Sequence, residues 1–175
     1  MLLKHESFKD FVLPLDTIAK LFLIIRVLGN ILWHFPFFGF LSAIGTFLIG
    51  GLLFITIIGV PIGLGLFQLG KFLFSPFSSA MVDRKELKQQ DDYAWNLFGL
   101  IIRVLYFPFG LVLALATICQ IAGLFITIVG IPIALVLAKS LGTYFNPVNK
   151  VCVPVAVRDE IAKRKAQEQI TNHLG

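Results

Sequence analysis

The stretch FITIIGVPIG at residues 54–63 recurs as FITIVGIPIA at residues 125–134, an offset of 71 positions. In both stretches a Gly-x-Pro triplet interrupts an apolar run. Proline removes a helical hydrogen-bond donor and pushes the residue before it out of the helical region, so a helix ends or kinks there. The two stretches therefore predict two related breaks between helices.

Two further landmarks follow the same order around each stretch. Pro76 and Pro147 lie at equal distances after the two central prolines. Upstream, FPFFG at residues 35–39 matches FPFG at residues 107–110, with a one-residue gap. Because a repeated order of landmarks is the mark of a repeated structural unit, the sequence predicts an internal duplication.

The composition is typical of a membrane protein. Hydrophobic residues make up 57% of the 175 residues and charged residues only 14%, whereas soluble domains carry about 25% charged residues. No Asp, Glu, Lys or Arg occurs in residues 27–70 or 104–138. Apolar runs longer than about 18 residues are typical of membrane-spanning helices. We therefore expect an integral membrane protein, with its N-terminal apolar stretch retained rather than cleaved as a signal peptide.

The prolines divide the apolar segments into two sets of three helices. We expect helices at residues 17–35, 40–58, 62–74, 93–107, 109–129 and 133–145. The middle helix of each set is long enough to cross a membrane core of roughly 30 Å, at about 1.5 Å per residue. The predicted fold class is all-α, with about four membrane helices and two short interfacial helices.

The last helix of each set is short and polar on one face. The polar residues are Gln68, Lys71 and Ser75 in the first set, and Lys139, Thr143 and Asn146 in the second. Spacings of three and four residues place such groups together on a helix, and a short amphipathic helix is expected in the membrane interface. The alternative is a broken half-helix that enters the membrane to build a site, as in transporters.

The chain order predicts five segments and their sidedness. They are an N-terminal segment (1–16), a first membrane repeat (17–77), a polar linker (78–92), a second membrane repeat (93–149) and a basic tail (150–175). Lys and Arg cluster in the first, third and fifth segments, so all three are predicted to be cytoplasmic. Each repeat then crosses an even number of times, and the two are parallel rather than inverted. The apolar turns at 35–39 and 107–110 either reach the far side or turn back within the membrane.

These motifs resemble one known family. The repeated Gly-x-Pro motif at 55–61 and 126–132, Pro76, Pro147 and the opening GNILW at 29–33 resemble the YccF-type inner membrane component domain of bacteria. The resemblance spans residues 26–150. It implies a small multi-pass protein of the bacterial inner membrane with two tandem domains, no defined activity and no catalytic residues to carry over. Two departures stand out: Gln68 replaces the lysine that Lys139 keeps, and Asn30 has no counterpart in the second repeat.

The motif breaks supply the first candidate site residues. They are Thr56, Gly59, Pro61, Thr127, Gly130 and Pro132. Carbonyl groups freed at a helix break can line a path for an ion or solute. The alternative is a structural hinge that only bends the chain from one helix into the next.

A second set consists of polar groups inside the apolar segments, namely Arg26, Gln68, Lys71, Arg103 and Lys139. A charge at the membrane centre costs about 2.5–3.5 kcal/mol on insertion scales, so each group has a function or reaches anionic headgroups. A third set forms a stripe of small residues through which helices approach closely, Gly130, Ala134, Ala138 and Gly142. Trp33 and Trp95 are expected to anchor the membrane interface, and Cys119 to be buried without a disulfide.

Enzyme chemistry is not indicated. The apolar segments contain no acidic residue, and the chain has no Cys/His cluster, phosphate-binding glycine loop or Ser-His-Asp set, so we expect no catalysis, no cofactor, no metal and no nucleic-acid partner. The expected partners are a bilayer with anionic headgroups and either further copies in a homo-oligomer or a larger membrane protein. The broken helices favour a small oligomeric channel or transporter component. The apolar turns and basic tail favour an accessory or scaffold protein.

Overall fold

The computed structural model describes residues 15–35, 37–57, 59–87 and 93–174. Nearly all of the predicted N-terminal segment, with Lys4 and Lys9, therefore lies outside the described residues. The same holds for Lys88 and the rest of the linker up to residue 92, and for the side chain of Trp95.

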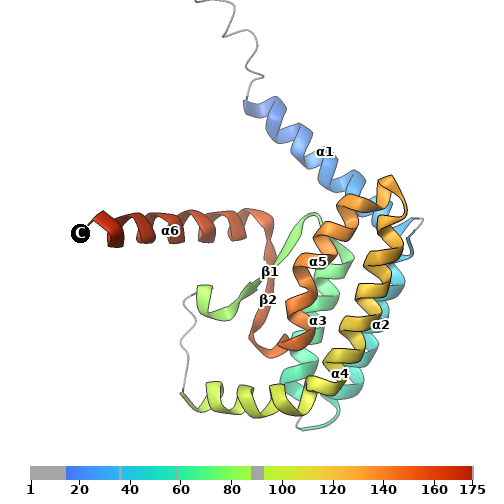
Figure 1. The fold of residues 1–175 in the computed structure, drawn as a ribbon, viewed down its shortest axis with the longest axis vertical. Helices are drawn as coiled ribbons and strands as arrows, with labels where there is room; N and C mark the ends of the chain where they lie inside the picture. The colour runs from blue at the N-terminus through green and yellow to red at the C-terminus, as the bar shows by residue number, and fades with distance from the viewer. Residues whose placement is uncertain (1–14, 36, 58, 88–92, 175) are drawn as a thin grey trace, which may run out of the picture.

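The described chain is mostly helical (Figure 1). Its α-helices are α1 (Leu15–His34), α2 (Gly39–Phe54), α3 (Val60–Phe74), α4 (Tyr93–Phe125), α5 (Ile131–Phe145) and α6 (Val155–Leu174). Short 3-10 helices are η1 (Arg84–Leu87), η2 (Ile128–Gly130) and η3 (Pro147–Asn149), and the strands are β1 (Ser79–Asp83) and β2 (Lys150–Pro154). The mostly helical class agrees with the prediction, which did not include the two strands.

Two helical hairpins form the body of the protein. Helix α2 packs against α3, and the C-terminal part of α4 packs against α5. The tips of the two hairpins lie at opposite ends of the body (Figure 1). The core between them contains fully buried residues at equivalent positions, with Ala43 matched by Ala114 and Leu66 by Leu137. The two hairpins therefore share one hydrophobic core.

An antiparallel ribbon of β1 and β2 joins the ends of the two hairpins. Ser79 lies opposite Pro154, and Asp83 lies opposite Lys150, with 2.9 Å between its Oδ1 and the lysine Nζ. The ribbon packs against α3 and α5, and α2 and α4 lie beyond them (Figure 1). The protein therefore has three layers, which are the ribbon, an inner helix pair and an outer helix pair.

Pro108 lies inside α4, which runs without interruption from Tyr93 to Phe125. The prediction of two helices separated by a turn at residues 107–110 is therefore wrong. A helix absorbs an internal proline as a kink, because only one hydrogen bond is lost and the ring clashes with the preceding turn. Figure 1 shows α4 changing direction between its N-terminal and C-terminal parts.

Helix α2 is shorter than predicted. It ends at Phe54 and has 16 residues, which span about 24 Å. The predicted end at residue 58 is wrong because the chain turns before the Gly-x-Pro triplet. Among the described residues, three helical segments are long and apolar enough to cross a membrane, namely Asp16–His34, Leu100–Phe125 and Ile128–Phe145. This count differs from the predicted four, and it contains α5 instead of α2.

Helices α3 and α5 lie in the middle layer. Nine of the 15 residues of α3 are buried, because α2 covers one side of it and the ribbon covers another. That these two helices lie in the membrane interface stays a prediction. Their polar faces are directed to the ribbon, which the sequence prediction did not contain.

Candidate functional site

Each Gly-x-Pro motif forms a hairpin tip that is held by a threonine hydroxyl. The Oγ1 of Thr56 donates to the carbonyl oxygen of Leu53 over 2.8 Å and accepts from the backbone N–H of Gly59 over 3.1 Å. The Oγ1 of Thr127 makes the two equivalent bonds, 3.2 and 3.1 Å long. Each hydroxyl thereby links the end of one helix to the start of the next.

The glycines of the motif are required by a close backbone approach. A Cβ on Gly59 would lie 2.1 Å from the carbonyl oxygen of Leu53, and Gly130 is equally tight, 2.2 Å from the corresponding carbonyl. Pro61 and Pro132 follow in the first turns of α3 and α5, where a missing N–H breaks no helical bond. These six candidate residues therefore build two compact turns.

The end of α1 is docked onto the end of α3. The Nε1–H of Trp33 donates to the carbonyl oxygen of Leu73 over 2.7 Å, and Nε2 of His34 lies 2.8 Å from the carbonyl oxygen of Phe74. These carbonyls have no partner within their own helix, because they belong to its last turn. Trp33 is completely buried, so the prediction that it anchors the membrane interface is wrong.

Asn30 completes this docking site, which the sequence prediction did not include. Its Nδ2 donates to Oγ of Ser78 over 3.0 Å, and its Oδ1 accepts from the backbone N–H of Phe77 over 3.1 Å. The sequence held one signal of this docking site, because Asn30 has no counterpart in the second repeat. It marks a contact that α1 makes and the start of α4 does not repeat.

Three of the four cations predicted inside apolar segments lie beside the ribbon or α6. Arg26 lines an open pocket that extends to α6. Lys71 lies near Cys152 in β2, and Lys139 lines a pocket between α5, β1 and α6. Arg103 is exposed on α4. The structure therefore gathers cations that are far apart in the sequence on the ribbon side of the hairpins.

Gln68 and Cys152 connect α3 to the ribbon. The Oε1 of Gln68 accepts from the backbone N–H of Cys152 over 3.3 Å, so this side chain is engaged by the protein itself. Burial raises the pKa of the Cys152 thiol, while the hydroxyl of Ser79 and the charge of Lys71 act in the opposite direction. Cys119 is exposed on α4, contrary to the prediction that it is buried, and both cysteines are free.

The stripe of small residues divides between two environments. Gly130 and Ala134 are buried within the second hairpin, whereas Ala138 and Gly142 are exposed. Steps of four residues rotate slightly past a full turn of about 3.6 residues, so such a stripe drifts around the helix. Only its C-terminal half is open to another helix.

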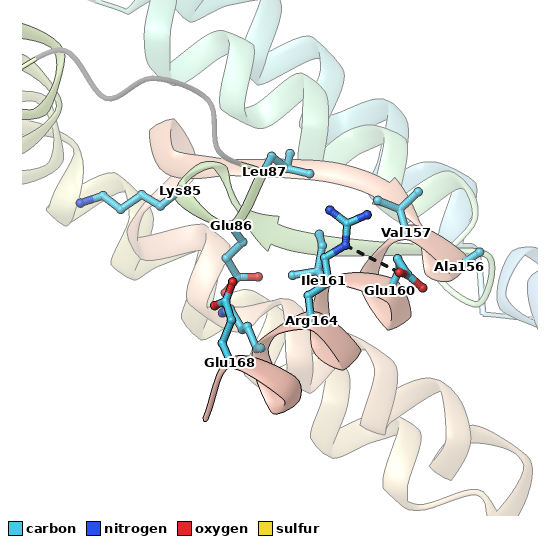
Figure 2. A pocket seen from close by; sticks show the side chains of 10 residues that line it. Lys85, Glu86, Leu87, Ala156, Val157, Glu160, Ile161, Arg164 and Glu168 are labelled. Carbon is cyan, nitrogen blue, oxygen red and sulfur yellow. Dashed lines mark hydrogen bonds and ion pairs between the residues drawn. The ribbon is translucent and has the colours of Figure 1, made fainter. Parts of the chain in front are cut away.

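A groove between η1 and α6 lies on the ribbon side (Figure 2). It has a volume of about 530 Å³. An ion pair between Glu86 and Lys165 crosses it, and Arg164 pairs with Glu160 along α6 over 3.6 Å. Exposed ion pairs contribute about 0–1 kcal/mol each, so the Glu86–Lys165 pair holds α6 against η1 only weakly. The sequence prediction treated the two segments as a separate linker and tail.

The described helices and their apolar surfaces define a membrane protein. Residues 28–79 match the family described as YccF, inner membrane component domain. The match starts beside the Asn30 docking site and ends in β1, so it contains the first hairpin and the contacts that fasten α1 to it. A second domain of this family at residues 93–149 stays a prediction. Comparisons with curated proteins and with solved structures found no match.

Proposed function

We propose that the protein is a membrane-embedded scaffold whose hairpins enter from the cytoplasmic side and whose ribbon, η1 and α6 remain at that surface. The observation that carries this proposal is the sorting of charge. The start of α1, η1, the start of α4 and α6 all lie on one side of the hairpins (Figure 1). The start of α1 carries Lys20, η1 carries Arg84 and Lys85, and α6 carries Arg158, Lys163, Arg164 and Lys165, so the positive-inside rule favours a cytoplasmic position for that side.

The ribbon favours one direction for the membrane normal. It lies beside the middle of the hairpins, between the two tips (Figure 1). If the hairpins crossed the membrane along their length, the Asp83–Lys150 ion pair and the charged helix α6 would lie near the bilayer centre. Each such charge costs about 2.5–3.5 kcal/mol there. Hairpins that lie in the membrane plane leave the ribbon and α6 outside the hydrocarbon core.

The face opposite the ribbon is suited to acyl chains. Leu48 and Leu52 on α2 are each 70% exposed, and Phe35 in the turn after α1 is 80% exposed. Phe38 in the same turn keeps a left-handed backbone, with φ of 53°, which residues other than glycine rarely adopt. Exposed apolar surface of this extent marks contact with a membrane or a partner. In this placement the turn at 35–39 turns back within the membrane, and the two hairpins are related by rotation about the membrane normal.

We also infer that the two hairpins are copies of one unit. Their tips carry the same threonine hydrogen bonds, and their last helices end in the same unusual backbone conformation. Ser75 has φ and ψ of −146° and 66°, and Asn146 has −144° and 67°. This supports the tandem arrangement that the sequence predicts.

A scaffold is favoured over a channel within one chain because the described core is filled. Leu66, Leu69, Ile133 and Leu137 between the hairpins have no exposed surface, and interiors packed in this way leave no route for water. A channel or transporter component is the second candidate. It requires several copies around a path, and the exposed Ala138 and Gly142 are a surface where another helix can approach.

Thiol labelling tests the placement. In a background with Cys119→Ser and Cys152→Ser, Phe38→Cys is expected to resist a membrane-impermeant maleimide from both sides of the membrane and to react after detergent is added. Lys163→Cys on α6 is expected to react from the cytoplasmic side. Labelling of Phe38→Cys from the periplasmic side would contradict entry from one side only.

Native mass measurement in lipid, combined with flux assays in liposomes, separates the two candidate functions. A monomer or dimer with no flux above protein-free liposomes is the result expected of a scaffold. A closed ring of four or more copies that conducts would replace the scaffold with a channel.

A further inference from the structure

A pocket of about 210 Å³ lies where α3, β1, α5 and α6 meet. Its apolar wall includes Phe72, Phe77 and Val136, and two cations, Lys139 and Arg158, also line it. None of the residues that line it is acidic. We propose that this pocket binds the phosphate of an anionic phospholipid, with Lys139 and Arg158 as the groups that contact it.

The two cations have capacity for an added anion. Among the described residues, no hydrogen bond or ion pair engages the ammonium group of Lys139. Arg158 uses Nε and Nη2 to bind Oδ1 of Asp159, over 3.0 and 2.6 Å, which leaves its Nη1 for a second acceptor. Guanidinium and ammonium groups both form charge-assisted hydrogen bonds with phosphate.

The first hairpin shows why the pocket is open only beside the second. Gly65 is the counterpart of Val136, and a Cβ on Gly65 would lie 2.3 Å from the carbonyl oxygen of Pro147. The chain after the second hairpin therefore packs directly on α3. Gln68, the counterpart of Lys139, bonds to the backbone of β2. The hairpins therefore differ at two paired positions. Val136 replaces Gly65 where the pocket is open, and Lys139 replaces Gln68 and adds a positive charge to the pocket.

The mixture of apolar wall and cations favours a lipid over a soluble anion. In the proposed placement the pocket lies between α5 and the ribbon, at the level of the headgroups, where a phosphate meets the cations and the glycerol and upper acyl chains meet the wall. The inference rests on that placement. Inorganic phosphate has the same charged group but nothing to contact Phe72, Phe77 and Val136, so the two sources can be separated by experiment.

Native mass spectrometry of the full chain in neutral detergent tests the proposal, with phosphatidylglycerol and phosphatidylcholine as probes. The unmodified protein is expected to retain phosphatidylglycerol in preference. Lys139→Gln, which copies Gln68, and Arg158→Gln are each expected to reduce that retention about tenfold, the effect of losing one charge-assisted hydrogen bond. Lys163→Gln makes the same charge change on the exposed face of α6 and serves as the control. Equal retention in Lys139→Gln and Lys163→Gln would overturn the site.

Two further arms keep the outcome clear. Val136→Phe fills the pocket without removing either cation and is expected to abolish the preference for phosphatidylglycerol. Circular dichroism checks that this variant folds. If it does not, Lys139→Met replaces it, because methionine keeps an apolar side chain of similar length and removes the charge. Binding of inorganic phosphate without retention of phosphatidylglycerol would overturn the lipid assignment. The maleimide experiment reports placement independently of lipid preference, so failure of the pocket and failure of the placement give different results.

Discussion

Met81 lies opposite Cys152 in the β1–β2 ribbon, and these residues are 71 positions apart, the same offset that separates the two Gly-x-Pro motifs. The other pairs are arranged symmetrically about this one, with Ser79 facing Pro154 and Asp83 facing Lys150. An approximate two-fold axis therefore passes between Met81 and Cys152. It relates two hairpins whose tips point in opposite directions (Figure 1).

Met81→Cys in a Cys119→Ser background is expected to form a disulfide with Cys152 on mild oxidation. Opposed residues in antiparallel strands have Cα atoms about 4.5–5.5 Å apart, within the range of about 4.4–6.8 Å that a disulfide requires. Intact-mass measurement detects the loss of two hydrogens. Asp83→Cys, which lies opposite Lys150, is the control; cross-linking at an equal rate would contradict the strand register.

Thr56→Val is expected to lower the free energy of unfolding by about 1 kcal/mol, because the hydroxyl that caps the hairpin tip is lost. Thr56→Ser keeps the hydroxyl and is expected to remain close to the unmodified protein. Thermal unfolding in detergent measures both. Thr127→Val at the other tip is expected to have a similar effect, since its hydroxyl makes the equivalent bonds. A neutral result at both positions would show that the tips are held by other contacts.

Trp33→Phe is expected to destabilise the protein by about 1–3 kcal/mol, because the buried carbonyl of Leu73 loses its donor. The control is Phe22→Leu, which changes an exposed aromatic residue on the same helix. Limited proteolysis between α1 and α2 provides a local readout beside thermal unfolding. If both variants behave alike, docking of α1 through Trp33 does not stabilise the fold.

The reactivity of Cys152 is expected to depend on pH in a specific way. Burial raises its thiol pKa, so the reactive thiolate is a smaller fraction at neutral pH than in a free cysteine. In a Cys119→Ser background, alkylation by iodoacetamide is expected to rise at a higher pH in the folded protein than in denaturant. Lys71→Gln removes a charge that lowers this pKa, so it should shift the profile to still higher pH. Identical folded and denatured profiles would contradict a buried thiol.

The sequence predicted most helix boundaries well where proline or a polar segment ends the apolar run. The helices expected at 17–35, 62–74 and 133–145 correspond to α1, α3 and α5, with boundaries within two residues. Three boundaries failed, and one of them is the predicted end at residue 129, because α4 ends at Phe125 ahead of the turn held by Thr127. The other two failed for related physical reasons. The hydroxyl of Thr56 ends α2 early by accepting from the backbone ahead of the proline, and α4 absorbs Pro108 as a kink.

The surroundings of the candidate site were harder to predict. Lys139 was identified from its spacing along α5, but its neighbour Arg158 was assigned only to a solvated tail. They line the same pocket because β1 pairs with β2, and each strand is only five residues long. Strands this short carry little periodic signal. The docking of Trp33 and Asn30 onto α3 was missed for the same reason, because it joins residues that are far apart in the chain.

The ribbon also has a consequence for how the protein assembles. Two separate chains with one hairpin each would have to meet in the membrane before β1 could pair with β2, so the pairing would depend on how many copies are present. Within one chain the strands are joined through α4 and α5, so their pairing is intramolecular and does not depend on the concentration of a second chain. The assembly of the ribbon is thereby made independent of expression level.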